Sequence, residues 1–528
     1  MKTVIKKIGI NGEGIGYLNR TPVFVQGALE GEEVDIEIVE RFPRYAIGKL
    51  NRIYRKSEHR CDAKCRIGHR CGSCAMMISD YDYQLSSKKA ILKQTLIKYA
   101  HVNPKLIGNV RSSNSEYHYR NQFKMPCAML DGQLINGFYA PESNYLIDVE
   151  HCMIHEKGLE KMRMMILNVL RKANYKGYSH KEKKGLRNLI VRGFKGSYQC
   201  TLVTGKEEIP QSVIDELMKI KGLVSLWQSI LTTKKTTEVF GKDMIFLAGD
   251  KLLSFELGDI KLQISPRSFF QLNTAQALQL YRCVAAMIDG RKKRIVEAYS
   301  GIGCISLFLK DKAEEIIGIE SIRDAVINAN MNAKNNGCEH IRFVCDDAAK
   351  RLVTLSKQGG IDVLVVDPPR SGLDDAMLKC ILKSNIKEII YISCNPATLG
   401  KNLAVLQERY EVKTVKPFDM FPQTQHVETV ALLSKLNADQ HIEIDLSMDE
   451  LDLTDAEKKA TYQEIKDYVL EHSGLKVSSL YIAQVKQQCG IIERENYNKP
   501  KSEDAKQPQC PPDKEKAIKE ALKHFGMI

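Results

Sequence analysis

Residues 291–436 alternate short apolar runs with amphipathic stretches, and this alternation constrains the fold more than any other feature of the chain. The apolar runs with strand composition cover residues 294–298, 316–320, 361–367 and 389–393. After the first run, Gly303 precedes a predicted helix that starts at Cys304. Because strands that alternate with helices form a parallel sheet covered on both faces, the segment is predicted to be an α/β, Rossmann-like domain.

The first two predicted strands end in residues that suit a nucleoside ligand. The turn Tyr299-Ser300-Gly301-Ile302-Gly303 follows the first strand, and its glycines let the backbone approach a ligand closely. Glu320 ends the second strand, where a carboxylate can accept both ribose hydroxyls of an adenosine. Ser306 stands where a dinucleotide motif has its third glycine, so S-adenosylmethionine, which has no pyrophosphate, fits better. A turn that serves packing alone is the alternative.

The next two predicted strands end in side chains that can do chemistry. Asp367-Pro368-Pro369-Arg370 follows the third strand, and Ser393-Cys394-Asn395-Pro396 follows the fourth. Ligands of doubly wound sheets bind beyond the carboxyl ends of the strands. Asp367 and Cys394 are therefore expected to face one crevice, whereas most other thiols are interpreted as small buried hydrophobes.

The charge balance of the chain indicates an anionic partner. Lys and Arg number 78 against 65 Asp and Glu, a formal net charge of +13, which favours nucleic acid. No apolar run reaches the ~20 residues that span a bilayer, and the N-terminal stretch lacks a secretory signal. We expect a cytoplasmic protein with no membrane partner, whose 15 Cys are free thiols, metal ligands or catalytic groups.

Residues 1–57 are predicted to form a small β-barrel. Short runs with strand character cover residues 4–5, 23–25, 34–38 and 46–50. The glycines between them are predicted to be turn residues, namely Gly12, Gly14, Gly16, Gly27 and Gly31. Composition leaves two uses for this barrel open, packing and oligonucleotide binding.

The central region, residues 58–290, is predicted to mix strands and helices. A helix in which lysines separate the apolar positions is expected from about Ser86 to Ala100. Residues 175–195 carry seven cationic side chains against one acid: Lys176, Lys181, Lys183, Lys184, Arg187, Arg192 and Lys195. Such a run is either a solvated face or a loop that contacts phosphates.

Residues 437–528 are predicted to be a separate helical extension of unknown role. Thr454 and Glu457 form a capping box for a helix that ends near Gly474. Further helices are expected over residues 478–488 and 514–525, with a Pro-rich linker between them. Nothing in this pattern is specific for one function.

Four cysteines form a candidate metal site. They are Cys65, Cys71, Cys74 and the distant Cys152. Four thiolates suit either zinc or an iron–sulfur cluster, and their spacing does not choose between the two. Cys61 is a fifth thiol nearby and leaves the ligand set open. Four unconnected core thiols are the alternative.

Five motifs, in chain order, resemble those of the RNA 5-methyluridine methyltransferase family, which uses S-adenosylmethionine on uridine in ribosomal or transfer RNA. They are Ser268-Phe269-Phe270-Gln271-Leu272-Asn273, Tyr299-Ser300-Gly301-Ile302-Gly303, Asp367-Pro368-Pro369-Arg370, Ser393-Cys394-Asn395-Pro396, and Asp419-Met420-Phe421-Pro422-Gln423-Thr424 with His426-Val427-Glu428. The resemblance covers about residues 1–436. It implies that residues 1–57 are a TRAM-like RNA-binding barrel and that residues 291–436 are the catalytic domain.

The reaction of that family needs one nucleophile and one base. Uracil C5 becomes nucleophilic only after a thiolate adds at C6, and the C5 proton must then be removed. The resemblance makes Cys394 the nucleophile and Glu428 the base. It implies S-adenosylmethionine contacts from Gln271, Tyr299, Glu320 and Asp367. Arg120 and Asn121 are candidates for RNA contact or for structural roles, and His426 is either an orienting or a structural residue.

The resemblance also implies a [4Fe–4S] cluster on Cys65, Cys71, Cys74 and Cys152. Cys65 is preferred to Cys61 because its spacing to Cys71 matches the family pattern, whereas Ser73 replaces a glycine that is common there. The role expected for such a cluster is structural, since methyl transfer from a sulfonium needs no electron.

Three functions compete. The first two are 5-methyluridine formation in 23S ribosomal RNA and the same reaction on the T-loop of transfer RNA. The barrel and the cysteines favour 23S ribosomal RNA, because the transfer-RNA branch of the family commonly lacks both. The third is a non-catalytic RNA-binding protein, against which the intact Cys394, Glu428 and Asp367 argue. The expected molecule is a monomer that binds RNA and not DNA.

Overall fold

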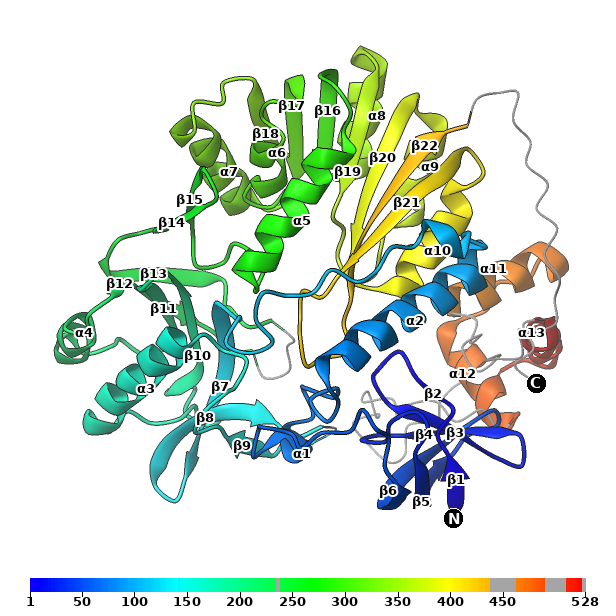
Figure 1. Ribbon diagram of the computed structural model, residues 1–528, viewed down its shortest axis with the longest axis horizontal. Coiled ribbons are helices and arrows are strands. Elements are labelled where there is room, and N and C mark those ends of the chain that lie inside the picture. The colour runs from blue at the N-terminus through cyan, green and yellow to red at the C-terminus, as the bar shows by residue number, and fades with distance from the viewer. Residues whose placement is uncertain (142, 234–237, 437–461, 490–509, 525–528) are drawn as a thin grey trace. The chain divides into compact units, whose positions relative to one another are not determined.

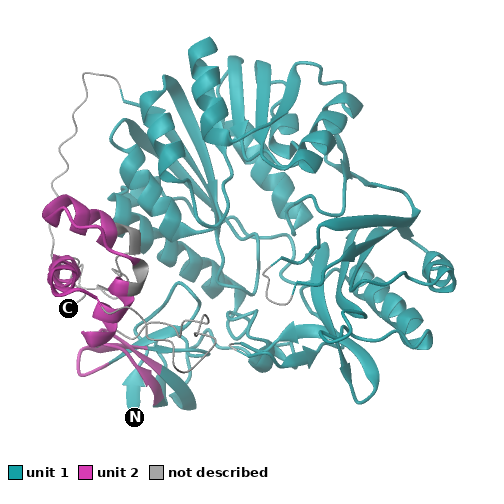
Figure 2. Ribbon diagram, turned by 180° about the vertical axis from the view of Figure 1, so that it is seen from behind, with its two compact units in different colours: residues 1–17, 24–37, 48–441 teal, residues 18–23, 38–47, 442–528 magenta. Residues whose placement is uncertain are grey.

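A computed structural model describes residues 1–141, 143–233, 238–436, 462–489 and 510–524 (Figure 1). The chain divides into two compact units, which Figure 2 colours separately. One unit comprises residues 1–17, 24–37 and 48–441, and the other comprises residues 18–23, 38–47 and 442–528. Within the described ranges, no helix combines the length and the apolar character that crossing a bilayer requires.

The N-terminal strands form one six-stranded sheet in the order β1-β5-β6-β4-β3-β2. Their bounds are β1 (Lys2–Val4), β2 (Lys7–Ile8), β3 (Gly14–Leu18), β4 (Thr21–Val25), β5 (Glu33–Arg41) and β6 (Ala46–Arg55). The prediction that Gly14 and Gly16 are turn residues is wrong, because both lie in β3. Close packing explains them, since a Cβ on Gly14 would lie 2.7 Å from the carbonyl oxygen of Ala28.

The C-terminal half of the larger unit contains a seven-stranded sheet in the order β18-β17-β16-β19-β20-β22-β21. Its strands are β16 (Lys292–Ala298), β17 (Ala313–Glu320), β18 (Ile341–Cys345), β19 (Ile361–Val366), β20 (Ile386–Ser393), β21 (Tyr410–Phe418) and β22 (Glu428–Lys435). The first five in this order are parallel, as predicted. Strand β22 runs antiparallel to both of its neighbours, β20 and β21. The strand–helix alternation does not predict this antiparallel strand.

Helices cover both faces of this sheet, so the predicted doubly wound α/β architecture is confirmed (Figure 1). The helices on one face are α2 (Tyr81–Ala100), α8 (Ala348–Gln358), α9 (Asp375–Lys383) and α10 (Pro396–Leu406). Those on the other face are α5 (Thr274–Met287), α6 (Cys304–Phe308) and α7 (Arg323–Asn335). Helix α2 begins at Tyr81, earlier than the predicted Ser86, because the Asp80 carboxylate accepts the Tyr83 N–H (2.8 Å) as an N-cap.

A second seven-stranded sheet, in the order β13-β12-β11-β10-β7-β8-β9, forms the central region. Its strands are β7 (Gln122–Leu130), β8 (Gln133–Tyr139), β9 (Leu146–Asp148), β10 (Leu186–Phe194), β11 (Ser197–Thr204), β12 (Leu223–Ile230) and β13 (Asp243–Gly249). The apolar sides of α3 (Lys157–Lys172) and α4 (Gln211–Met218) pack against it. The smaller elements are α1 (Gly68–Cys71), η1 (Pro104–Leu106) and the hairpin β14 (Leu253–Leu257) to β15 (Ile260–Ile264).

Arg192, one of the seven cationic residues at 175–195, is buried and is not part of an exposed cationic face. Arg192 lies in β10 and is buried, and its guanidinium donates to the carbonyl oxygen of Ser268 (2.7 Å). Arg192 therefore braces the segment that precedes Gln271 and is unavailable to phosphates. Lys176, Lys181, Lys183, Lys184 and Lys195 are exposed.

In the C-terminal extension, the described residues form three helices around a small apolar core. These are α11 (Tyr462–Ser473), α12 (Ser479–Gln488) and α13 (Pro512–His524). Ile465, Ile482 and Ile518 are among the buried residues that they share. The expected helices near residues 478–488 and 514–525 are present, whereas the Thr454–Glu457 capping box lies outside the described residues.

Candidate active site

The sheet order brings three predicted site residues to one edge. Cys394 follows β20, and β22 pairs antiparallel with β20, with Ser393 opposite Thr429. Because β22 runs against β20, its first residue, Glu428, lies at the same edge as Cys394. Asp367 follows β19, the parallel neighbour of β20 on its other side, and so reaches this edge too.

The surroundings of Cys394 disfavour a thiolate. Burial raises the pKa of the Cys394 thiol to about 11, and the nearby carboxylates of Glu428 and Asp367 act in the same direction. The charge of Arg370 partly opposes them. A second cation at this edge would therefore favour the nucleophilic form of the thiol.

The surroundings also disfavour the charged forms of the two carboxyl groups. Burial raises the pKa of Glu428 well above its ordinary value, Asp367 adds to this effect, and Arg370 opposes it. Glu428 is 3% exposed, and removal from water likewise raises the pKa of Asp367. The edge thus holds one thiol and two carboxyl groups that a bound cation would ionise.

The turn predicted to contact a nucleoside, residues 299–303, has left-handed backbone angles of the kind that glycine adopts easily. Tyr299, Gly301 and Gly303 adopt positive φ angles of 64°, 53° and 81°. A Cβ on Gly303 would lie 2.4 Å from the ring of Phe343, whereas a Cβ on Gly301 would meet no atom within 4 Å. The turn is therefore packed on one side and open at Gly301.

Glu320 is fixed beside the open side of this turn. Its Oε2 accepts the N–H of Gly301 (3.0 Å), and its Oε1 accepts the N–H of Ile322 (2.9 Å). Each carboxylate oxygen retains further acceptor capacity. The open backbone and the oriented carboxylate together fit the ribose of a nucleoside.

Gln271 is buried, and its backbone is held by a buried asparagine. Its carbonyl oxygen accepts a hydrogen bond from Nδ2 of Asn121 (2.9 Å), which also donates to Oγ1 of Thr274 (2.9 Å). Asn121 is 1% exposed, so its candidacy for RNA contact is wrong and its structural alternative holds. Its role is to fasten the Gln271 segment to the start of β7.

A buried ion pair holds the loop before Glu428, and its lysine was not among the candidate site residues. Lys88 and Asp419 form an ion pair (Nζ to Oδ1, 2.5 Å) between two fully buried side chains. The hydroxyl of Tyr81 donates to the other oxygen of Asp419 (2.8 Å). Lys88, one of the lysines interspersed with the apolar positions of this helix, is therefore a buried residue. No local pattern marks it, because its partner is 331 residues away.

His426 lies in the same loop. Its backbone N–H donates to Oγ1 of Thr424 (3.3 Å), and its ring meets that of Phe421 edge-on. Burial lowers the pKa of His426 to about 4, and the charges of Arg370, Lys88 and Arg120 add to the effect. The imidazole is therefore neutral at ordinary pH, which is compatible with both roles considered for it.

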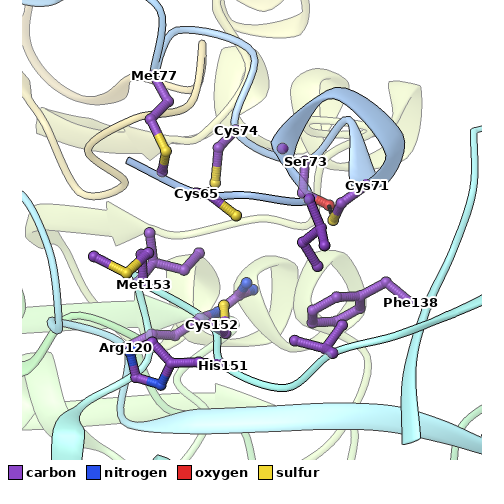
Figure 3. Close-up of a pocket in the computed structure, with 14 residues that line it drawn as sticks. Cys65, Cys71, Ser73, Cys74, Met77, Arg120, Phe138, His151, Cys152 and Met153 are labelled. Carbon is purple, nitrogen blue, oxygen red and sulfur yellow. Dashed lines mark hydrogen bonds between the residues drawn. The ribbon is translucent and has the colours of Figure 1, made fainter. Parts of the chain in front are cut away.

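The four candidate metal-site thiols line one small cavity of ≈ 50 Å³ (Figure 3). Cys65, Cys71 and Cys74 come from the segment before α2, and Cys152 comes from the loop before α3. Cys61 is not among the lining residues. Over the ranges that the structure describes, no three or more His, Cys, Asp or Glu side chains are arranged to hold a metal ion. The fold thus brings the four thiols to one cavity, but their sulfur atoms are not arranged around a common metal position.

The chemistry of this cavity suits a soft, thiolate-bound group. Apolar side chains, including Met77 and Ile154, pack around Cys74 and Cys152. Arg120 also lines the cavity, and its buried Nε has no hydrogen-bond partner. A cationic nitrogen beside four thiols is suited to balance the negative charge of a thiolate site.

Comparisons with known proteins show the family of the chain. A family model described as tRNA (Uracil-5-)-methyltransferase matches residues 80–436, and a TRAM domain model matches residues 4–50. An uncharacterized RNA methyltransferase of Bacillus cereus is 38% identical over 440 residues, which are 81% of this chain and 95% of that protein. One from Clostridium tetani is 36% identical over 440 residues, with the same shares of both chains.

A solved structure also resembles the chain over most of its length. It is the crystal structure of Pyrococcus abyssi tRNA (uracil-54, C5)-methyltransferase in complex with S-adenosyl-L-homocysteine. That protein is 25% identical, with a TM-score of 0.66, and the match covers 82% of this chain and 100% of that chain. The expected methyltransferase fold and the N-terminal TRAM domain are therefore confirmed. With the family model spanning residues 80–436, the chain belongs to the tRNA (uracil-5-)-methyltransferase family.

Proposed function

We propose that this protein, an RNA uracil-5-methyltransferase that uses S-adenosylmethionine, acts on uridine in 23S ribosomal RNA, with Cys394 as the nucleophile and Glu428 as the base. The observation that carries these two roles is that Cys394 directly follows β20 and Glu428 begins β22, the antiparallel neighbour of β20, close enough for the two side chains to interact electrostatically. The reaction needs a thiol and a carboxylate on one substrate ring, and this edge supplies both.

The chemistry follows from these two groups. The Cys394 thiolate forms a bond to uracil C6, and the electron pair of the C5–C6 double bond moves into an enolate. C5 then attacks the sulfonium methyl, and the sulfur keeps the electron pair of the broken bond. Glu428 removes the C5 proton, the double bond re-forms, and Cys394 leaves C6 as a thiolate.

The charge of the methyl donor completes the electrostatics of the site. Burial and the two carboxyl groups raise the pKa of Cys394, and Arg370 opposes them only in part. A sulfonium at the same edge supplies the further positive charge that favours the thiolate and the Glu428 carboxylate. We place Gln271, Tyr299, Glu320 and Asp367 around this donor, with Glu320 on its ribose.

The target uridine lies in a folded RNA and must leave its stack to reach Cys394, at a cost of a few kcal/mol. We propose that the N-terminal barrel and the exposed lysines at residues 176–184 hold the RNA backbone during this step. In this scheme residues 1–57 and 58–290 bind RNA, and residues 291–436 catalyse.

Transfer RNA is the second candidate substrate. The Pyrococcus abyssi protein named as a tRNA methyltransferase aligns over its whole length with 82% of this chain, which favours a transfer-RNA substrate. The barrel and the cysteine segment are the features on which the choice of ribosomal RNA rests. The two substrates therefore belong in one experiment.

The test is methyl transfer from labelled S-adenosylmethionine to unmodified 23S ribosomal RNA and to unmodified transfer RNA, in parallel, with products mapped by mass spectrometry. We expect 5-methyluridine in the ribosomal RNA. Label in transfer RNA alone overturns the substrate and keeps the chemistry. No label in either RNA from folded protein identifies a non-catalytic RNA-binding protein instead.

We further propose that Cys65, Cys71, Cys74 and Cys152 hold a [4Fe–4S] cluster. Their shared cavity, its apolar wall and the unpartnered Nε of Arg120 support this ligand set. A bound cluster would cross-link the Cys65–Cys74 segment to Cys152 and needs no redox role here. Protein purified without oxygen should be brown and contain iron, whereas a colourless protein with zinc would identify the alternative metal.

A further inference from the structure

The loop between β21 and β22 leads directly to the proposed base, Glu428, which is the first residue of β22. It comprises residues 419–427, and the two residues that flank it, Phe418 and Glu428, are paired across the strands. Within it, the Thr424 hydroxyl donates to the carbonyl oxygen of Phe421 (2.8 Å) and accepts the N–H of His426 (3.3 Å). These short-range bonds link the middle of the loop to His426, two residues before Glu428, so we expect a shift in the loop to displace the start of β22.

Gln84 of α2 holds the tip of this turn. Its Nε2 donates to Oε1 of Gln423 (3.1 Å), and its Oε1 accepts the backbone N–H of Gln423 (2.9 Å). Both side chains are 1% exposed. Gln423 has a φ of 71°, a left-handed conformation that a non-glycine residue keeps only when its neighbours hold it.

The same Gln84 amide also reaches the segment that carries the cysteines. Nε2 lies 3.1 Å from the carbonyl oxygens of Met76 and Ser79, and the N–H of Met76 donates to the carbonyl oxygen of Gln423 (3.0 Å). One buried amide thus joins three pieces of chain: α2, the residues just after Cys74, and the loop that leads to Glu428.

The nucleophile is positioned by a separate set of contacts. The Ser393 hydroxyl accepts the N–H of Asn395 (3.2 Å), and Nδ2 of Asn395 donates to the carbonyl oxygen of Arg370 (3.2 Å). None of these bonds involves Gln84 or Gln423. Because base and nucleophile have different supports, weakening one should slow only its own step.

We propose that Gln84 is a positioning residue for proton removal by Glu428. It acts through Gln423, whose strained backbone and side chain it holds, and it ties the position of the base to the cysteine segment. This inference rests on the proposed roles of Cys394 and Glu428. A misplacement of about 1 Å in a catalytic group can cost about 10²-fold in rate, so loss of this support should be visible in the elimination step.

The test separates the two steps with two RNA substrates. In RNA with 5-fluorouridine at the target, fluorine occupies C5 and no proton can be removed, so the covalent Cys394 adduct reports addition and methyl transfer alone. In ordinary RNA, slow proton removal leaves the methylated adduct bound, and this adduct is visible as a protein–RNA band on a denaturing gel.

The variant is Gln84→Met, which keeps most of the side-chain volume and removes the amide. We expect adduct formation on 5-fluorouridine RNA within about 3-fold of the unmodified protein, and turnover on ordinary RNA slower by about 10- to 10²-fold with adduct accumulating. Gln94→Met, at an exposed position of the same helix, is the matched control and should match the unmodified protein in both assays.

Two results overturn the proposal. Equal slowing of both steps would mean that Gln84 supports the fold in general, and unchanged turnover would mean that it supports nothing in the reaction. If Gln84→Met does not fold, Gln423→Ala makes the same test from the side of the loop. Errors in the roles proposed for Cys394 and Glu428 give a different result from an error in the role of Gln84. If Cys394 is not the nucleophile, Cys394→Ala still forms the covalent adduct. If Glu428 is not the base, Glu428→Gln does not accumulate the methylated adduct.

Discussion

The Lys88 ammonium and the Asp419 carboxylate meet in the interior, with Nζ 2.5 Å from Oδ1 and neither side chain exposed. The pair joins α2 to the loop before the proposed base, and Nζ also donates to the carbonyl oxygen of Phe421 (3.1 Å). Removing two charges from water is costly, so the net stability that such a pair adds is small. Removing one partner is far more harmful, because the other charge stays buried and unpaired.

Lys88→Met should therefore lower the free energy of unfolding by about 3–5 kcal/mol, measured by urea denaturation. Adding Asp419→Asn should recover part of this loss, because it replaces the unpaired buried carboxylate by a neutral amide. Lys89→Met is the matched control, since the ammonium of Lys89 lies at the surface, where it donates to Asn109. A double variant no more stable than Lys88→Met would contradict the charge argument.

Replacement of the two proposed catalytic side chains should stop the reaction at different stages. Cys394→Ala should form no covalent adduct and no 5-methyluridine, because C5 is not activated. Glu428→Gln should still form the adduct but release product about 10²–10⁴-fold more slowly, the usual contribution of a positioned base. Denaturing gels and product mapping distinguish the two. Normal methylation by Cys394→Ala would refute the nucleophile assignment.

The pH dependence of ligand binding should distinguish the methyl donor from its product. Burial raises the pKa values of Asp367 and Glu428, and the charge of Asp367 raises that of Glu428 further, so in the free protein both hold protons above the ordinary carboxyl range of about 4. A cationic sulfonium binds better when they are ionised. Affinity for S-adenosylmethionine should therefore rise with pH through this range, measured by calorimetry.

The neutral thioether S-adenosylhomocysteine is the control ligand for this measurement. It lacks the sulfonium charge, so its affinity should rise much less over the same pH range. Asp367→Asn should flatten the difference between the two ligands, since it removes one of the two carboxyl groups. Parallel pH curves for both ligands would show that these carboxyl groups do not sense the sulfonium.

Glu297, at the end of β16, should make stability depend on pH. Burial raises its pKa to about 8, although the N–H and hydroxyl of Ser306 both donate to it. Between the ordinary value of 4.5 and about 8, the unfolded chain loses this proton and the folded protein keeps it. The free energy of unfolding should therefore fall with rising pH in this window, by up to about 1.4 kcal/mol per pH unit from this group.

Glu297→Gln tests this directly, because the amide still accepts the Ser306 hydrogen bonds and cannot ionise. Its stability should exceed that of the unmodified protein near pH 8, and the difference should shrink near pH 5. Urea denaturation at both pH values measures it. An equal difference at the two pH values would show that Glu297 does not carry the pH dependence.

Local patterns were enough to predict the catalytic fold and to nominate the residues of the candidate site. Apolar runs that alternate with helical stretches indicate a doubly wound sheet, and the ends of its strands mark Glu320, Asp367 and Cys394. Where a prediction failed, the reason was tertiary. Gly14 and Gly16 resemble turn residues but lie in β3, because neighbouring chain leaves no room for a Cβ. Asn121 and Arg192 are polar side chains for which the sequence allowed contact with RNA. Both are buried in the structure, where they donate hydrogen bonds to distant segments of the chain.

The sequence by itself determined which residues can react, because reactivity depends on side-chain type and on position at a strand end. Only the tertiary structure decided which residues hold them in place. Gln84 and Lys88 carry no local signal, since their partners Gln423 and Asp419 lie more than 300 positions away. A buried polar side chain must find a partner in three dimensions, and that partner depends on how β21, β22 and α2 pack, which no local spacing encodes.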